Sequence, residues 1–139
     1  MALAVIAADR VTKELAPGIF PGGRELIPGV IGLRYAENRG IAFSLLSGAP
    51  WVLGVLSLLI IVGMFLYLRG KQVPRLSRIG LMLMLGGAAG NMFDRLFRGF
   101  VPDMIEFLFM NFAVFNVADA CLCTGCALVI LRLLFGKDE

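Results

Sequence analysis

The sequence predicts an all-α membrane protein with four transmembrane helices and a small extracytoplasmic β-element between helices 1 and 2. The first observation behind this prediction is composition: 59% of the 139 residues are hydrophobic and 17% are charged, with a mean hydropathy of +0.88. Globular domains average roughly 45–50% apolar residues. The second is that four spans of about 20 residues each would absorb nearly all of this apolar content. The chain is therefore expected to form one membrane domain, 1–139.

The predicted spans are approximately 1–16, 51–68, 76–93 and 112–133. The first is short, and we expect Pro17 to stop it, with Asp9 facing protein and Lys13 reaching the membrane surface. The second lies in a run without charge that extends from residue 40 to 68, and the third follows from a similar run over 79–93. In the fourth, Asp119 is the only charged residue between positions 107 and 131.

Basic residues predict the orientation of the spans. The short connection after the second span contains four of them and no acid, namely Arg69, Lys71, Arg75 and Arg78. Such loops are cytoplasmic, so both termini are expected in the cytoplasm and connections 17–50 and 94–112 outside. Residues 30–43 alternate well enough to predict the β-element, with a turn at 38–40. The net charge of +3 is thus explained by the membrane surface, and no nucleic-acid partner is expected.

The sequence contains no histidine, which excludes histidine-based triads and histidine-ligated zinc. Cys121, Cys123 and Cys126 follow a C-x-C-x-x-C pattern, but on a helix the first two point about 200° apart. We therefore expect packing roles for the cysteines, and neither a metal nor a cofactor. Gly86 and Gly90 have the spacing that lets membrane helices approach closely.

Carboxylates remain as candidates for chemistry. An ionisable side chain inside a membrane span indicates a functional site, and Asp119 has Asn116 three positions earlier on the same expected helix face. Asp103, after Pro102, is the proposed partner among three acids near the outer face, Asp94, Asp103 and Glu106. If Asp103 and Asp119 meet, they would share one proton and activate a water molecule. A purely structural role for Asp119, for example pairing with Arg95, stays open.

Three side chains are candidates for contacts with a substrate carbonyl or oxyanion: Asn38, Arg95 and Asn116. Asparagines in such loops also commonly satisfy the backbone. For Arg95, an ion pair with Asp94 or another acid is the favoured interpretation.

Five segments resemble, in order, the motifs of the lipoprotein signal peptidase (signal peptidase II) family. They are ADRVTK at 8–13, NRGIAFSLL at 38–46, GNMFDR at 90–95, GFVPDMIEF at 99–107 and FNVADA at 115–120. Two positions depart from the usual family pattern: Met104 stands where phenylalanine is common, and Ala120 where serine is common.

The resemblance implies a multi-pass aspartic endopeptidase of the bacterial inner membrane. Its expected substrates are diacylglyceryl-modified prolipoproteins in the lipid phase, cut before the lipid-modified cysteine. Asp103 and Asp119 fall on the catalytic dyad positions. The supporting positions that the resemblance carries over are Asn38, Asn91, Asp94, Arg95, Asn116, Asp9 and Lys13.

Two other classes of membrane protein are alternatives. A small ion- or proton-coupled carrier would use Asp9 and Asp119 as relay carboxylates, but it should show repeated or broken helices, which the sequence lacks. A non-catalytic scaffold held together by glycine packing would give no reason for acids at both 103 and 119.

Overall fold

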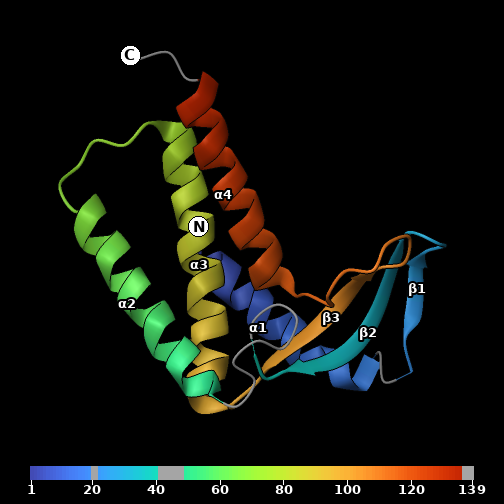
Figure 1. Cartoon of the computed structure of the whole chain (residues 1–139). Coiled ribbons are helices and arrows are strands. Elements are labelled where there is room, and N and C mark those ends of the chain that lie inside the picture. Colours follow the sequence, from blue (N-terminus) through green and yellow to red (C-terminus); the bar gives the residue numbers. More distant parts are fainter. Residues whose placement is uncertain (20–21, 41–48, 136–139) are drawn as a thin grey trace.

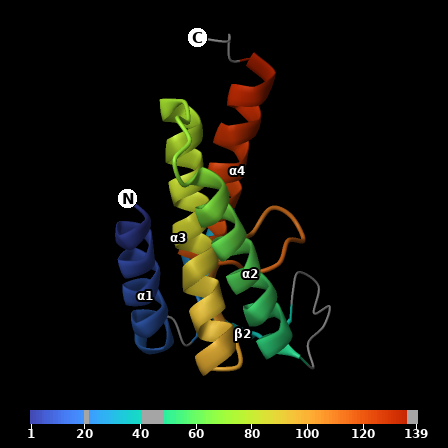
Figure 2. The same ribbon diagram turned by 90° about the vertical axis from the view of Figure 1, so that its left-hand side faces the viewer.

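The helix α3 (Arg75–Phe97) is the centre of the fold, because α1 (Ala2–Ile19), α2 (Pro50–Leu68) and α4 (Val117–Phe135) all pack against it (Figures 1 and 2). The computed structural model describes residues 1–19, 22–40 and 49–135. A three-stranded sheet stands beside the helices at the end where α1, α3 and α4 meet (Figure 1).

Glycines on α3 permit this close packing. A Cβ atom at Gly86 would lie 2.7 Å from the Cβ of Val5 on α1, and one at Gly87 would collide with the carbonyl oxygen of Ala118 on α4. Gly90 faces Asp9, whose Oδ2 would lie 2.5 Å from an added Cβ. The predicted close approach at Gly86 and Gly90 is confirmed, and it brings α1 and α4 to the same stretch of α3.

The sheet has the order β1 (Arg24–Ile27), β2 (Ile31–Asn38), β3 (Val101–Phe107), and both pairs are antiparallel. The element predicted between the first two helices is present, but the sheet also recruits β3 from the connection between the last two helices. Sequence reasoning missed β3, because Pro102 and two acids obscure its alternation. Its register pairs Ala36 with Asp103 near one end and Ile31 with Phe107 at the other.

The helix boundaries differ from the predicted spans. Pro17 lies inside α1 and does not stop it. A proline fits helical φ and removes one backbone bond, and α1 ends only two residues later. The helix α3 continues to Phe97, about one turn beyond the predicted end at 93. The helix α4 begins at Val117 and not at 112, since Phe115 is extended and exchanges two backbone hydrogen bonds of 2.8 Å with Ile105.

Among the described residues, α2 and α4 are long and apolar enough to cross a membrane by length and composition. Most of the α2 surface is apolar and exposed, including Leu59, Ile60 and Phe65 at 61–62%. Apolar surfaces of this extent require an apolar environment. Spans at α1 and α3 remain a prediction.

Candidate active site

The N-terminus of α4 is held by a reciprocal capping arrangement between Asn116 and Asp119. The backbone N–H of Asp119 donates to Asn116 Oδ1 at 2.9 Å, and the backbone N–H of Asn116 donates to Asp119 Oδ2 at 3.3 Å. This is the geometry of a capping box. Asp119 therefore lies in the first turn of α4, within the candidate span Val117–Phe135 but close to its end.

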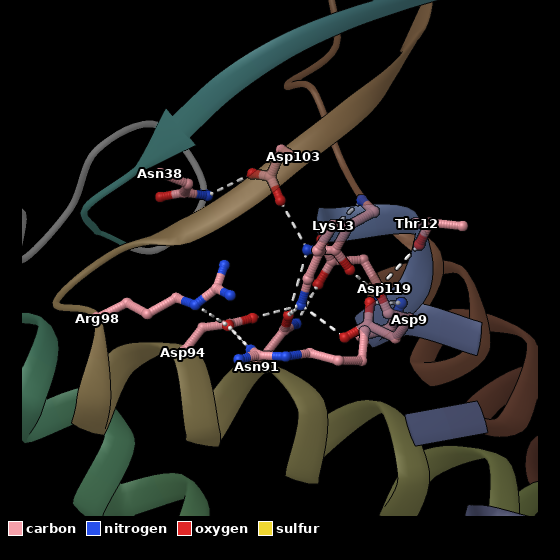
Figure 3. Close-up of polar contacts among 12 residues, drawn as sticks. Asp9, Thr12, Lys13, Asn38, Asn91, Asp94, Arg98, Asp103 and Asp119 are labelled. Atoms are coloured by element: carbon pink, nitrogen blue, oxygen red, sulfur yellow. Dashed lines mark hydrogen bonds and ion pairs between the residues drawn. The ribbon is translucent and has the colours of Figure 1, made fainter. Parts of the chain in front are cut away.

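The side chain of Asn116 extends from this cap to β3. Its Nδ2 donates to Asp103 Oδ1 at 2.6 Å. From the other side, Nδ2 of Asn38 donates to Asp103 Oδ2 at 3.1 Å (Figure 3). The pairing of β2 with β3 places Asn38 beside Asp103. Both carboxylate oxygens of Asp103 thus accept an amide N–H.

Asp103 and Asp119 are neighbours, because one residue binds both of them: Asn116 contacts Asp103 through its side chain and Asp119 through its backbone. Asp103 is 1% exposed. Burial, together with the negative charge of Asp119, raises the pKa of Asp103 to about 7. The raised pKa favours a proton on Asp103 beside the charged Asp119.

A third amide, Asn91 on α3, completes the contacts of Asp119. Its Nδ2 donates to Asp119 Oδ1 at 2.7 Å, and its Oδ1 accepts from Lys13 Nζ at 2.9 Å and from Asn116 Nδ2 at 3.2 Å. Because an ammonium group only donates, Lys13 requires the oxygen of Asn91 on its side, and the NH₂ group of Asn91 consequently faces Asp119.

Lys13 is fully buried between α1 and α3, with ion pairs of 2.7 Å to Asp9 and to Asp94 (Figure 3). The prediction that Lys13 reaches the membrane surface is wrong, because three buried oxygen acceptors satisfy its ammonium group inside the protein. The prediction that Asp9 faces protein is confirmed: Asp9 is 2% exposed, and its Oδ1 accepts the backbone N–H of Ala118 at 3.0 Å. Asp9 thus also caps α4.

Asp94 is the acceptor for three cations. Besides Lys13, Arg10 approaches it at 3.2 Å and Arg98 at 3.5 Å. Sequence reasoning missed both arginines, although Arg98 stands four residues after Asp94, the spacing of helical ion pairs.

The expected pairing of Arg95 with Asp94 or another acid is wrong, since none of the ion pairs within 1–19, 22–40 and 49–135 includes Arg95. Its Nη2 donates to the backbone oxygen of Gly40 at 3.4 Å. Its Nε is buried and has no acceptor among the described atoms.

A cavity of about 490 Å³ opens beside these groups. Its polar lining comes from Asn38, Arg95, Asp119 and Thr124, and its remaining walls are mostly apolar, from Val101, residues 112–115 and the first turns of α4. Phe107, Phe112 and Phe115 form a cluster with ring centroids 5.1–6.2 Å apart. An extended apolar peptide fits such a lining better than a charged one.

The cysteines of α4 differ in surroundings. Cys121 is half-buried, whereas Cys123 and Cys126 are exposed, and Cys123 lines the cavity. The predicted packing role therefore holds only in part. Within the described part of the chain, no group of three histidine, cysteine or acidic side chains is placed to hold a metal ion.

A family model described as signal peptidase (SPase) II matches residues 1–135. The chain belongs to the signal peptidase II family. It is 40% identical to the lipoprotein signal peptidase of Syntrophomonas wolfei subsp. wolfei, over 99% of this chain and 93% of that protein. The lipoprotein signal peptidase of Streptococcus pneumoniae is 36% identical, over 99% of this chain and 90% of the relative.

The fold agrees with this assignment. A solved structure described as a bacterial membrane enzyme superposes with a TM-score of 0.86 at 28% identity, covering 99% of this chain and 89% of the other. A second structure with a similar description has a TM-score of 0.85. The resemblance inferred from the five motifs is confirmed, and family membership favours a peptidase over a carrier or a scaffold.

The two departures from the usual signal peptidase II motifs lie close to the site. Met104 is buried in β3, and its backbone N–H donates to the Phe115 oxygen at 2.9 Å. Ala120 lines the cavity directly after Asp119. Neither change removes a polar group that holds the two acids. Most of the NRGIAFSLL motif, 41–46, lies outside the described residues.

Proposed function

We propose that this membrane signal peptidase removes the signal peptide from diacylglyceryl-modified bacterial prolipoproteins, with Asp103 and Asp119 as its catalytic dyad. Family membership supports the reaction. One observation supports the dyad: the two acids are bound to the same asparagine, Asn116, and Asp119 lines a mostly apolar cavity. The cut falls directly before the lipid-modified cysteine.

The two acids take different roles in hydrolysis. Asp119 accepts N–H groups from Asn91 and Asn116 and lies in the first turn of α4, where the helix dipole favours negative charge. It is the base: it takes a proton from a water molecule, whose oxygen forms a bond to the scissile carbonyl carbon. Asp103, with its raised pKa, is the acid. It gives its proton to the amide nitrogen as the C–N bond breaks.

Arg95 and Asn38 are the proposed donors for the negative charge that develops on the carbonyl oxygen. Both line the cavity, and the Nε–H of Arg95 has no acceptor among the described atoms. Donors held in place in a water-poor site stabilise such a charge strongly. The Nδ2 group of Asn116 already donates to Asp103 and Asn91. We therefore assign Asn116 to holding the dyad and not to the oxyanion.

The placement of the basic residues supports a membrane topology for the chain. We propose that all four helices cross the inner membrane, that residues 1–139 form one domain, and that both termini are cytoplasmic. The basic connection between α2 and α3 and the end of α4 lie at one end of the molecule, and the sheet with the dyad lies toward the other (Figure 1). The positive-inside rule makes the basic end cytoplasmic. The dyad then faces the outer leaflet.

Cleavage of a defined precursor tests this function. We expect the protein, reconstituted in liposomes, to cut a diacylglyceryl-modified prolipoprotein peptide at the bond before the modified cysteine, as read by mass spectrometry. The same peptide with an unmodified cysteine is the matched control, and we expect much slower cleavage because it lacks the lipid that holds it in the membrane. Equal cleavage of both peptides would contradict the assigned substrate class, and an intact modified peptide would contradict the peptidase activity.

The pKa of Asp103 predicts the alkaline limb of the pH profile. Asp103 must carry its proton to act as the acid, so we expect kcat/KM to fall as pH rises through about 7, with the pair titrating as a coupled unit. The Asn38 hydrogen bond lowers the pKa of Asp103. Asn38→Ala should therefore move the alkaline limb to higher pH, whatever it does to the maximal rate.

A matched control for this shift is Glu106→Gln on the same strand. Glu106 pairs with Arg34 at 3.1 Å, outside the dyad. We expect its profile to follow that of the wild type. An alkaline limb that stays in place in Asn38→Ala, measured over the same pH range, would show that Asp103 does not supply the proton.

A further inference from the structure

The end of the sheet opposite Asp103 carries an exposed apolar surface. It consists of the β1–β2 turn, residues 26–30, and the segment after β3, residues 108–112, which we call the apolar tip. Leu26 is 62% exposed, Phe109 63% and Met110 47%. No charged residue occurs between positions 26 and 33 or between 107 and 118. Monomeric soluble surfaces rarely gather apolar side chains in this way.

The two segments form one surface. The register pairs Ile27 with Ile31 and Ile31 with Phe107 at this end of the sheet. The backbone N–H of Leu108 donates to the Val30 oxygen at 3.0 Å, which ties the two segments together.

The backbone of the apolar tip is suited to an apolar environment. Four of its N–H groups have acceptors within the protein: Gly29 donates to Glu25 Oε2 at 3.0 Å, Val30 to Ile27 at 2.9 Å, Leu108 to Val30 at 3.0 Å and Phe112 to Met110 at 3.1 Å. Backbone donors without a partner would make entry into lipid costly. The tip therefore presents apolar side chains on a backbone in which at least these four donors are satisfied.

The apolar tip also lies at the height of a membrane helix. In Figure 1 the strands rise from the site, so that the β1–β2 turn and the segment after β3 reach past the level at which α4 begins, to one side of that helix. The tip therefore lies at the depth of the first turns of α4, a helix long and apolar enough to cross a membrane.

We propose that the apolar tip inserts into the outer leaflet, among the upper parts of the lipid acyl chains. This inference rests on the proposed function only through the membrane orientation. The expected depth is that of interfacial apolar segments, roughly 5–10 Å below the headgroup boundary. The cavity, whose walls include residues 112–115 and α4, then opens between two lipid-facing elements, and a lipid-anchored precursor reaches Asp119 without leaving the membrane.

Depth-dependent fluorescence quenching tests the insertion. Trp51 is the chain's single tryptophan, so Trp51→Phe gives a silent background. The double variant Trp51→Phe/Phe109→Trp is reconstituted in liposomes that contain lipids brominated on their acyl chains. We expect blue-shifted emission and strong quenching. The matched control is Tyr35→Trp in β2, away from the tip, where we expect quenching to be much weaker.

Two results would overturn the proposal. Emission of Phe109→Trp at the wavelength of tryptophan in water would place the tip in solvent. Blue-shifted emission without quenching, together with crosslinking between copies, would place a second copy of this chain on the tip. Neither readout depends on cleavage, so failure of the insertion is distinguishable from failure of the peptidase assignment.

The kinetics of a variant test whether insertion of the tip helps the enzyme to bind its lipid-modified precursor. Phe109→Glu places a charge on the apolar tip at a residue outside the cavity lining. We expect KM for the diacylglyceryl-modified precursor to rise roughly 10-fold, the change expected from losing one buried large apolar side chain, with kcat retained. An unchanged KM, in a variant whose folding matches the wild type, would contradict insertion of the tip.

Discussion

Asp119→Asn and Asp103→Asn should each lower kcat for precursor cleavage by about 10³- to 10⁴-fold, the range in which removal of one member of an acid–base unit falls. Asparagine keeps the shape of the side chain but neither takes a proton from water nor gives one to the leaving nitrogen. Because the two acids act as one unit, we expect the double variant to be little worse than either single one. Single-turnover cleavage of the modified precursor in liposomes measures these rates.

Two matched variants make this result specific. Glu106→Gln changes an acid of the same strand β3 whose partner is Arg34, and it should retain most of its activity. Asn116→Ala removes the side chain that joins the dyad. We expect an intermediate loss for it, since both acids remain but their mutual orientation is relaxed. Activity close to wild type in either dyad variant would move the reaction to another carboxylate.

The sequence predicts those parts of the site whose residues belong to short local motifs. Asp103 and Asp119 were singled out because acids are rare in an apolar chain, and the structure places them beside one another. The sequence also contained the signal for the cap of α4. The residues Asn116 and Asp119 have the spacing of a capping box, but the uncharged run before them led to a predicted helix start at 112. Hydrophobicity indicates that a segment is buried in lipid, and it does not indicate where helix begins.

Long-range contacts explain most of what the sequence did not reveal. The pairing of β3 with β2 joins segments more than 60 residues apart, and no local pattern in residues 101–107 encodes that partner. The burial of Lys13 has the same origin. A lysine near the end of a short apolar helix commonly reaches the surface, and only Asp94 and Asn91, some 80 residues away, supply the acceptors that hold it inside.

Lys13→Met is expected to have the second-largest effect, because Lys13 acts on both stability and the dyad. Its removal leaves Asp9 buried without its cation, and uncompensated buried charges of this kind cost about 3–5 kcal/mol in folding free energy. Asp94 retains Arg10 and Arg98. Thermal unfolding in detergent should therefore show a large loss of stability.

A second substitution separates stability from positioning. In Lys13→Met/Asp9→Asn the uncompensated charge is gone, and the asparagine oxygen still accepts the Ala118 N–H that Asp9 accepted. We expect much of the lost thermal stability to return. We do not expect kcat to return with it. Without the ammonium group, the oxygen of Asn91 keeps only the longer hydrogen bond from Asn116 Nδ2, so its amide is held less firmly and presents oxygen to Asp119 for part of the time.

The kinetic constants of the stability-rescued double variant distinguish the two roles of Lys13. If Lys13 positions Asn91, kcat should stay low while KM stays close to the wild-type value, because the N–H of Asn91 no longer faces Asp119 all of the time. A purely structural lysine predicts full kcat once stability is restored. The same measurement on Thr12→Ala, one residue before Lys13 and bonded only to backbone oxygens of α1, supplies the baseline.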